Sequence, residues 1–554
     1  MTDQEPAITP EQIAAAEALL DLNFTPAQRE QMRKTLSDRL EHFAALRANP
    51  LENSVPPALH FNVNAADPAP AAVPRSYPMS AQPPVTRPAD LEDAAFYPVT
   101  QLAELIRTRQ VTSLELTEMY LARLRRYDPV LQCVATYTDA LALSQAKRAD
   151  EEIARGLYRG PLHGIPWGAK DLLAARGYPT QWGAKTYEGQ QLDVDATVVQ
   201  RLEAAGAVLI AKLASGALAN GDVWYGGVTK NPWDTSEGSS GSSAGSAAAT
   251  AAGLVGFAIG SETMGSIVSP ASRCGVSGLR PTFGRVSRYG AMALSWSLDK
   301  IGPMCRSVED CALVFSAIYG PDGRDLSLTP EPFQWDPALD PRALRIGYIA
   351  SAFEAADAGD TDAHHRPEGE ELQRANDINS AAVLDVMRAA GFALTPIELP
   401  DTDITGLWVI LAAEAAAAFD QITRDGSVDQ LTRQDDDAWP NIFRAGRFIP
   451  AVEYINANRV RSQIVAEMAR LMTEVDVFIS PSYGGRTLGL TNLTGHPTAV
   501  VPNGFTDRGT PTSITFVGGL HKEAETLAVA KAYQDATDWH FQHPDLNACK
   551  KSES

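Results

Sequence analysis

The residues with the clearest chemical potential are two serines that lie 24 positions apart, Ser242 and Ser266. Both stand in Gly-containing turns, and the stretch that includes them reads GSSAGSAAATAAGLVGFAIGSETMGS. A serine hydroxyl is a weak nucleophile until a neighbouring base removes its proton. The chemistry that these residues offer is therefore nucleophilic catalysis, provided that a base lies nearby.

The segment between the two serines predicts the elements that would position them. A helix opening at Ser242 or Ser243 and stopping near Gly253, followed by a strand over Leu254–Gly260, fills the interval. Serine is a favoured N-cap, and glycine is favoured just past a helix end. A helix and a returning strand of this length would carry both serines to the same edge of a sheet.

Two other interpretations of this Gly/Ser-rich stretch are a flexible linker and a phosphate-binding turn. The stretch lies in mid-chain and continues into an apolar segment that belongs in a core, which argues against a linker. It also lacks the Gly-Lys-Ser/Thr ending of a P-loop and the GxGxxG spacing of a dinucleotide turn. Neither interpretation is favoured.

Three motifs give the chain a specific resemblance. The box Gly241–Ser246, the segment Gly260–Gly290 and the upstream motif PLHGIPWGAKDLL, Pro161–Leu173, resemble those of the amidase signature family, in the family's order. Lys170 in the upstream motif stands 72 residues before Ser242. The resemblance runs from about Leu91 to about Leu546, so we treat it as a family relationship rather than a chance match.

The resemblance implies a Ser–Ser–Lys triad. Position by position, Ser266 is then the nucleophile, Ser242 the bridging serine and Lys170 the base. The family holds its bridging serine after a cis peptide bond, which corresponds to Gly241–Ser242 here. Ser243 matches a serine that supports the triad by hydrogen bonding.

Lysine serves as a base only when it is neutral, because an ammonium group has no lone pair. Burial in an apolar pocket lowers the pKa of a lysine. The residues on both sides of Lys170, Trp167–Ala169 and Leu172–Ala175, suit such a pocket. Asp171 is the exception, and we expect its side chain to point elsewhere.

The same resemblance implies an oxyanion hole made of backbone N–H groups in the turn before the nucleophile, at Thr263, Met264, Gly265 and Ser266. The sequence departs from the family pattern at two places. Met264 stands where a second glycine is common, and Val268 stands where arginine is common. Both changes make the surroundings of the nucleophile less polar.

The fold class predicted is α/β, with one large amidase-signature domain whose mixed central sheet is covered by helices on both faces. A helix, a glycine and a strand follow one another at Thr197–Leu213 and again at Ala381–Leu399, an alternation typical of this class. A further helix is expected over Pro303–Gly320. We divide the chain into an N-terminal helical region 1–63, a Pro/Ala-rich linker 64–90, the catalytic domain 91–546 and a tail 547–554.

The N-terminal region predicts two helices. Thr9-Pro10-Glu11-Gln12 has the pattern of a capping box with proline at the first helical position, and Thr25-Pro26 opens a second helix that runs to about Arg47. A helical pair before an extended tail weakly resembles the small C subunit of tRNA-dependent amidotransferases. We favour the alternative, an ordinary helical appendage that packs on the enzyme or on a second copy.

Composition limits the partners. The net charge of −21 argues against nucleic-acid binding through a basic surface, and we see no apolar run long enough to span a membrane and no signal peptide. The five scattered cysteines form no CxxC pair, so neither zinc nor a disulfide framework is indicated. The adjacent pair His364-His365 is interpreted as part of an exposed loop. We expect a soluble, cytoplasmic protein without metal or cofactor, with a homodimer as one option for its assembly.

Three residues outside the triad are assigned to substrate binding. Tyr225 and Trp233 belong to a loop that resembles the family's approach loop, with a core anchor as the equal alternative for Trp233. Arg447 is assigned to an acyl pocket. Glu414 belongs to a helix that resembles one near the family's substrate tunnel, and His496 is the histidine to check for proximity to the site, although a packing role is preferred.

The function predicted is hydrolysis of a carbon–nitrogen bond in a small amide, aryl amide or carbamate through an acyl-enzyme on Ser266, with esterase side activity. A hydrophobic or aryl substrate is preferred because Met264 and Val268 are apolar. One alternative is the glutaminase-type A subunit of a tRNA-dependent amidotransferase. Another is a non-catalytic binding protein that keeps the fold.

Overall fold

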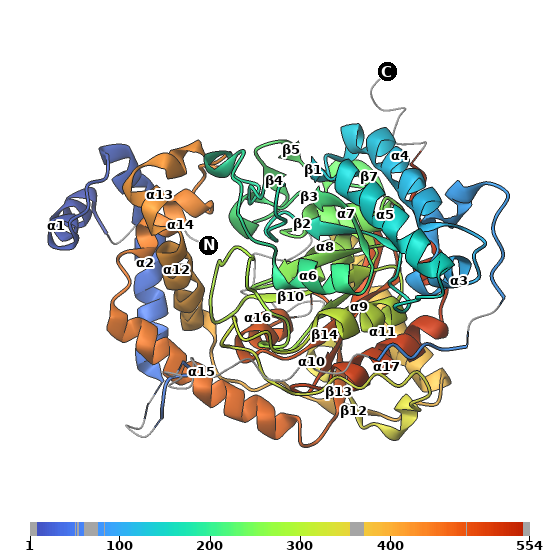
Figure 1. The fold of residues 1–554 in the computed structure, drawn as a ribbon. Helices are drawn as coiled ribbons and strands as arrows, with labels where there is room; N and C mark the ends of the chain where they lie inside the picture. The colour runs from blue at the N-terminus through green and yellow to red at the C-terminus, as the bar shows by residue number, and fades with distance from the viewer. Residues whose placement is uncertain are drawn as a thin grey trace.

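A mixed sheet of 11 strands runs through the protein in the computed structural model (Figure 1). The structure describes residues 8–49, 51, 55–59, 76–81, 84–354, 370–483 and 485–546. The strands are β1 (Val134–Tyr137), β2 (Pro166–Lys170), β3 (Val208–Leu213), β4 (Val223–Trp224), β5 (Gly227–Val228), β6 (Lys230–Asn231), β7 (Asp234–Gly238), β8 (Phe257–Glu262), β9 (Ser277–Arg280), β10 (Lys300–Cys305), β11 (Ile346–Ile349), β12 (Leu394–Ile397), β13 (Val477–Pro481), β14 (Thr498–Phe505) and β15 (Pro511–Gly518).

The order in the large sheet is β1-β3-β2-β8-β10-β9-β14-β15-β13-β11-β12. Strands β3, β2 and β8 are parallel neighbours at one end, and β13, β11 and β12 are parallel at the other. The strands between them pair antiparallel, so the predicted mixed sheet is confirmed. Because β2 and β8 are parallel neighbours, their carboxyl ends meet at one edge of the sheet.

Helices cover both faces of this sheet, as predicted: α7 and α8 pack on one face, and α9, α11 and α17 on the other. The helices are α1 (Pro10–Leu20), α2 (Pro26–Ala48), α3 (Val99–Arg107), α4 (Ser113–Leu131), α5 (Asp139–Ala154), α6 (Thr197–Ala204), α7 (Ala244–Ala251), α8 (Val268–Cys274), α9 (Val308–Ile318), α10 (Ala350–Glu354), α11 (Glu370–Ala389), α12 (Trp408–Ala418), α13 (Asp420–Arg424), α14 (Trp439–Gly446), α15 (Ala451–Leu471), α16 (Thr487–Thr494) and α17 (Glu523–Asp535).

The helix–glycine–strand pattern predicted these elements well. Helix α6 ends before Gly206, which has φ of +84°, and β3 follows with every residue buried. A Cβ at Gly206 would lie 2.3 Å from the ring of His163, so only glycine fits there. The same succession joins α11 to β12, as expected.

Two local predictions need correction. The helix expected over Pro303–Gly320 begins only at Val308, because Pro303 belongs to β10, which pairs with β8 and β9. Ser243 stands at the N-cap position of α7, but its side chain makes no capping bond. Its hydroxyl is instead engaged by Lys170 and Ser261.

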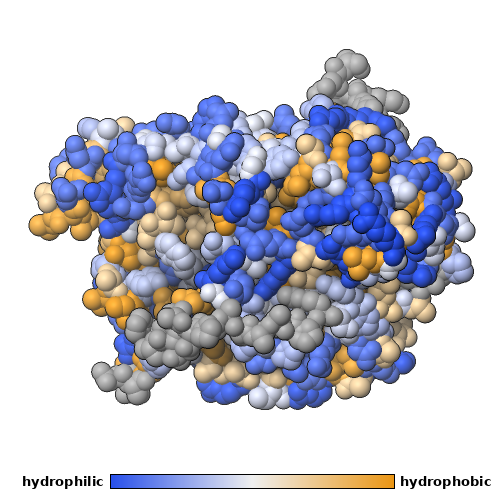
Figure 2. All heavy atoms as spheres, in the orientation of Figure 1, coloured by the Kyte–Doolittle hydropathy of each residue, from blue (hydrophilic) through white to orange (hydrophobic). Residues whose placement is uncertain are grey.

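The N-terminal helices α1 and α2 both open with the capping box that the sequence predicts, at Thr9 and Thr25. Helix α2 packs against α14 and α15 at the side of the molecule (Figure 1). Hydrophilic side chains cover much of the visible surface, with hydrophobic ones at the end where α1 lies (Figure 2). There Leu19 is 89% exposed.

Several sequence predictions lie outside the described residues. These are most of the linker 64–90, the tail 547–554 and the pair His364-His365. Among the helices that the structure describes, none is both long enough and apolar enough to cross a bilayer.

Candidate active site

Lys170 is the last residue of β2, and its side chain is fully buried. Its Nζ donates to Ser242 Oγ at 2.7 Å, to Ser261 Oγ at 2.9 Å and to Ser243 Oγ at 3.1 Å. Burial lowers the pKa of Lys170 to about 7. The amine therefore has a large neutral fraction near neutral pH, as a base needs.

The neighbouring Asp171 is directed to a different partner. Its carboxylate pairs with Lys212 of β3 at 2.8 Å, and both side chains are fully buried. It also accepts a hydrogen bond from Gln181 N. The carboxylate next to the lysine in sequence is thus neutralised elsewhere and does not form an ion pair with Lys170.

Ser242 follows a cis peptide bond with Gly241, the conformation that the family resemblance implies. A Cβ at Gly241 would lie 1.8 Å from Gly221 O, so the backbone passes too close for any other residue. Ser242 itself is fully buried. The next residue, Ser243, donates its N–H to Ser266 O at 3.2 Å, which ties the two serine-bearing turns together.

Ser266 lines a pocket of about 950 Å³ together with Gly241, Thr263 and Met264. Within the described part of the chain, the Ser266 hydroxyl makes no hydrogen bond, including none to Ser242. The structure therefore places the lysine against the bridging serine and the nucleophile candidate at the pocket wall. The remaining link, from Ser242 to Ser266, is not a hydrogen bond in this conformation.

The turn Thr263–Ser266 presents unused donors. None of its four backbone N–H groups has a hydrogen-bond acceptor among residues that the structure describes, and Thr263, Met264 and Ser266 line the pocket. Backbone N–H groups next to a serine nucleophile are the usual donors to the oxyanion of acyl transfer. The turn has the donors that an oxyanion hole requires.

A buried carboxylate fixes the far side of this turn. Glu262 Oε2 accepts the N–H groups of Ile267 at 2.8 Å and Val268 at 2.9 Å, and its Oε1 pairs with Arg280 at 2.7 Å. Burial acts to raise the pKa of Glu262, but Arg280 and these N–H donors hold it at about 2. Glu262 thus accepts the N–H groups that follow Ser266, while those of Thr263–Ser266 have no acceptor among the described residues.

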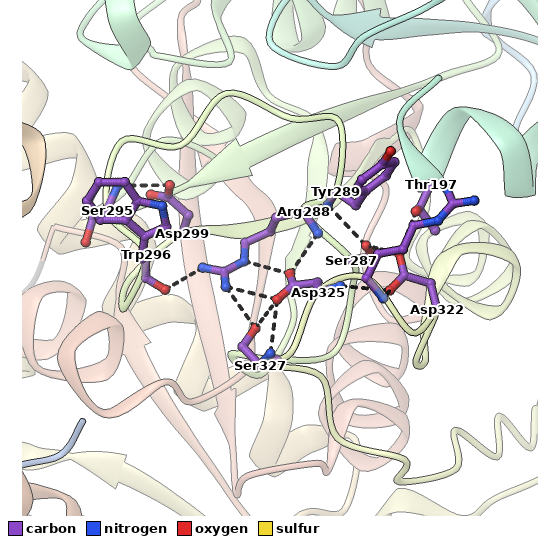
Figure 3. Close-up of polar contacts among 12 residues, drawn as sticks. Thr197, Ser287, Arg288, Tyr289, Ser295, Trp296, Asp299, Asp322, Asp325 and Ser327 are labelled. Carbon is purple, nitrogen blue, oxygen red and sulfur yellow. Dashed lines mark hydrogen bonds and ion pairs between the residues drawn. The ribbon is translucent and has the colours of Figure 1, made fainter. Parts of the chain in front are cut away.

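A second carboxylate fixes the near side. Asp299 accepts Thr263 Oγ1 at 2.7 Å and the N–H groups of Leu294 and Ser295 at 2.8 and 2.9 Å. Figure 3 shows Asp299 beside Ser295 in a loop that is joined through Arg288 to Asp325. This network holds the side chain of Thr263 and with it the start of the turn.

The Ser266 pocket has walls of two kinds. Helices α12 and α14 contribute apolar side chains, which include Trp408, Leu411 and Trp439. Helix α2 contributes polar and charged ones, which include Asp38 and Arg39. The pocket therefore offers both a hydrophobic and a charged surface to a ligand.

With this geometry established, comparison with known proteins identifies the chain. The model of the family described as Amidase matches residues 115–527. The chain belongs to the amidase family.

Relatives of this amidase-family protein share most of its length. It is 36% identical over 485 residues to the A subunit of the glutamyl-tRNA(Gln) amidotransferase from Chloroflexus aggregans, an alignment that covers 79% of this chain and 96% of the relative. The structure of native peptide amidase from Stenotrophomonas maltophilia has a TM-score of 0.66 and 29% identity, covering 80% of this chain and 97% of that one. An amidase family protein from Bacillus anthracis has a TM-score of 0.71 and 25% identity, covering 82% and 93%.

Three residues assigned to substrate binding in this amidase-family chain do not line the Ser266 pocket. Tyr225 packs edge-on against Trp224, and Arg447 pairs with Asp420. Trp233 donates its indole N–H to Cys274 O at 2.8 Å and packs against Phe505, the core-anchor alternative.

Two further assignments also lie elsewhere. His496 is buried and hydrogen-bonds Thr494 Oγ1 at 2.8 Å, and burial lowers its pKa to about 3, which fits the packing role. Glu414 accepts the hydroxyls of Ser295 at 2.6 Å and Ser297 at 2.7 Å and does not reach the pocket lining.

Ser261 is the residue of the amidase core that sequence reasoning missed. It is the penultimate residue of β8, and its hydroxyl lies 2.9 Å from Lys170 Nζ. The available signal was its place in the motif GSETMGS, at the end of the strand predicted to return to the sheet edge. The sequence does not reveal its proximity to Lys170, because that lysine comes from a different strand.

The two departures from the family pattern take different positions. Val268 is fully buried in a cluster with Ala247, Ala251 and Ile267 and does not line the pocket. Met264 is 7% exposed and lines the pocket. Only Met264 therefore adds apolar surface next to Ser266. Among the described residues, no group of three or more His, Cys, Asp or Glu could hold a metal ion.

Proposed function

We propose that this protein hydrolyses a carbon–nitrogen bond through an acyl-enzyme on Ser266. Ser242 relays protons and Lys170 serves as the base in this proposal. The observation that carries it is the 2.7 Å contact between Lys170 Nζ and Ser242 Oγ inside a buried site, beside a turn whose residues Thr263, Met264 and Ser266 line the pocket. Membership of the amidase family supports the same reaction.

The proposed reaction begins with neutral Lys170. Its lone pair accepts the proton of Ser242, and Ser242 accepts the proton of Ser266 as Ser266 Oγ bonds to the substrate carbonyl carbon. The carbonyl oxygen takes up the electron pair and is stabilised by N–H groups of the turn Thr263–Ser266.

The protons then return along the same route to the leaving nitrogen, and the C–N bond breaks to leave the acyl-enzyme. Water releases the acid by the same steps. The relay requires Ser266 to turn its hydroxyl to Ser242 when substrate is bound. Catalytic hydrogen bonds often tighten only in the substrate complex.

The apolar wall supports an aryl or other hydrophobic substrate. Trp408, Trp439 and Met264 line the pocket with Ser266. Aromatic side chains supply large contact areas to flat apolar ligands. Rates on matched aryl amide, ester and carbamate substrates test this preference, and faster turnover of small polar amides would contradict it.

The acyl-enzyme is tested by intact mass after incubation with a panel of aryl esters and carbamates. We expect the wild type to gain the mass of the acyl group and Ser266→Ala to gain none. Ser240→Ala is the control, because Ser240 lies in the loop of Ser242 and its hydroxyl hydrogen-bonds Ser269 rather than Lys170, Ser242 or Ser266. Acylation of Ser266→Ala would refute the assignment.

The similarity to the A subunit of an amidotransferase favours a second candidate, a glutaminase that passes ammonia to partner proteins. The two candidate functions differ in whether activity requires other proteins. A free-standing amidase turns over without other proteins, whereas the glutaminase stays inactive until its partners are added. Assays of the isolated chain with glutamine and with aryl amides separate them.

A further inference from the structure

Helix α2 brings a second functional group to the pocket that contains Ser266. One face of this helix is anchored in the protein, where Met32 and Leu36 pack with Ala445, and Asn441 donates to Thr35 Oγ1 at 2.8 Å. Its neighbouring positions, which include Arg39, line the pocket. The N-terminal region is therefore part of the site wall.

Arg39 stands out among the charges of this wall. Only 7% of the residue is exposed, and its Nε is buried without a hydrogen-bond partner. Arg39 forms no ion pair with any residue in the described ranges. Its charged sequence neighbour Asp38 pairs with Lys34 at 2.9 Å.

The other cations of the pocket already have partners. Arg433 pairs with Asp435 at 2.7 Å, and Arg486 donates to the carbonyl oxygens of Pro400 and Thr402. The remaining carboxylates of the pocket lining are exposed, so water screens them; they belong to Asp401, Asp403, Asp436 and Asp437. Among the described residues that line the pocket, the buried charged group without an ion-pair partner is thus the Arg39 guanidinium, which is positive.

A buried cation without an ion-pair partner is costly, because it has lost its hydration, and the attraction of Asp38 does not outweigh this loss at Arg39. Burial lowers the pKa of Arg39 to about 10, which leaves it protonated at neutral pH. A guanidinium binds a carboxylate through paired N–H donors. A ligand that carries a carboxylate can supply the negative charge that Arg39 lacks.

We propose that Arg39 binds a carboxylate carried by the substrate, so that this protein acts on amides with an anionic group remote from the scissile bond. The inference rests on the proposed hydrolysis at Ser266. It makes α2 a substrate-binding element: the apolar wall takes the hydrophobic part of the substrate and Arg39 takes its acid.

The test compares two 4-nitroanilides that differ in one terminal group, glutaryl 4-nitroanilide with a carboxylate and pentanoyl 4-nitroanilide with a methyl group. We expect wild type to favour the glutaryl substrate in kcat/KM. In Arg39→Met, which keeps an unbranched apolar stem and removes the guanidinium with its charge, that preference should fall by about tenfold or more, mainly through KM. Arg39→Lys should retain part of it.

Arg433→Met is the matched control, since it removes a pocket arginine that is already paired. This variant should keep the wild-type preference for the glutaryl substrate. A preference unchanged in Arg39→Met, or absent from wild type, would overturn the inference. Loss of the preference in Arg433→Met to the same extent would also overturn it, because the effect would then be one of general charge.

Binding without turnover separates this inference from the proposed function. In the Ser266→Ala background, glutarate should raise the thermal unfolding midpoint, and the additional change Arg39→Met should abolish the rise. If wild type hydrolyses neither anilide, the proposed function fails, while the thermal shift still decides whether Arg39 binds the acid. Stabilisation by glutarate that persists without Arg39 would refute its role.

Discussion

At the carboxyl end of β2, Lys170 Nζ is surrounded by three serine hydroxyls and forms no ion pair among the residues that the structure describes. Hydroxyl oxygens accept hydrogen bonds from the amine but supply no full negative charge to offset its desolvation. Glu262 and Asp299 act on it only at longer range, and they do not outweigh burial. Desolvation therefore determines the protonation state of this amine.

The first prediction concerns pH. Because only neutral Lys170 accepts a proton and its pKa is lowered to about 7, kcat/KM should fall about tenfold for each pH unit below that value and level off above it. A pH–rate profile on an aryl amide measures this. Lys170→Met should lose the dependence and reduce kcat/KM by a factor on the order of 10²–10⁴. The range from pH 5 to pH 8 extends about one unit or more to each side of this pKa. A wild-type kcat/KM that stays constant over this range would contradict the role of Lys170.

The second prediction concerns the support of the turn. Glu262→Gln leaves Arg280 buried without its counter-charge, and both partners are fully buried, so the free energy of unfolding should fall by about 3–5 kcal/mol. Urea denaturation at neutral pH measures it. Glu237→Gln, which breaks partly exposed pairs with Arg273 and Arg508, should cost about 1 kcal/mol or less for each pair.

The lowered pKa of Glu262 also predicts how acid changes the stability of the protein. The folded pKa of Glu262 is about 2 and its ordinary value is 4.5, so its contribution to stability is present above pH 4.5 and is lost as the pH falls towards 2. The difference in stability between wild type and Glu262→Gln should shrink over that range. A difference that stays constant would show that the carboxylate does not pair with Arg280.

At the scale of elements, helix α2 both packs and lines a pocket. Its buried positions Met32, Leu36, Phe43 and Leu46 dock on the rest of the chain through two separate hydrophobic clusters. Arg47 Nε also reaches Glu453 at 2.9 Å. Docking over this length fixes the side chains between the clusters, and Arg39 lies among them.

The third prediction follows from this docking. Met32 is fully buried, so Met32→Ala should reduce the free energy of unfolding by about 2–5 kcal/mol if α2 unfolds with the domain. If α2 opens by itself, amide exchange in 26–48 should accelerate while exchange in β8 stays unchanged. Leu40→Ala is the control, because Leu40 is 46% exposed and its change should stay within about 0.5 kcal/mol. An equal loss in both variants would contradict the docked arrangement.

At the scale of the whole molecule, the site is assembled from segments far apart in the chain. The sheet brings β2 and β8 side by side, α7 packs against both strands, and α2 from the N-terminal region lines the pocket. The loop that includes Asp299 holds the turn Thr263–Ser266 through the hydrogen bond from Thr263 Oγ1 to Asp299.

The sequence by itself determined the features that depend on residues close together in the chain. The alternation of helix, glycine and strand and the capping boxes at Thr9 and Thr25 follow from local backbone chemistry, and they were predicted correctly. The motifs around Lys170 and Ser242 were recognised for the same reason, since each is a continuous stretch. The structure places their side chains 2.7 Å apart.

Only the tertiary structure decided which side chains surround the pocket that contains Ser266. Trp233 has the residue type and motif position of a pocket residue, yet its indole N–H is taken by Cys274 O in the core. Arg39 has no motif, yet the docking of α2 leaves it buried and unpaired beside the pocket of Ser266. Pocket walls form where distant segments pack, and the packing free energy that brings them together is spread over the whole core rather than encoded at any one residue.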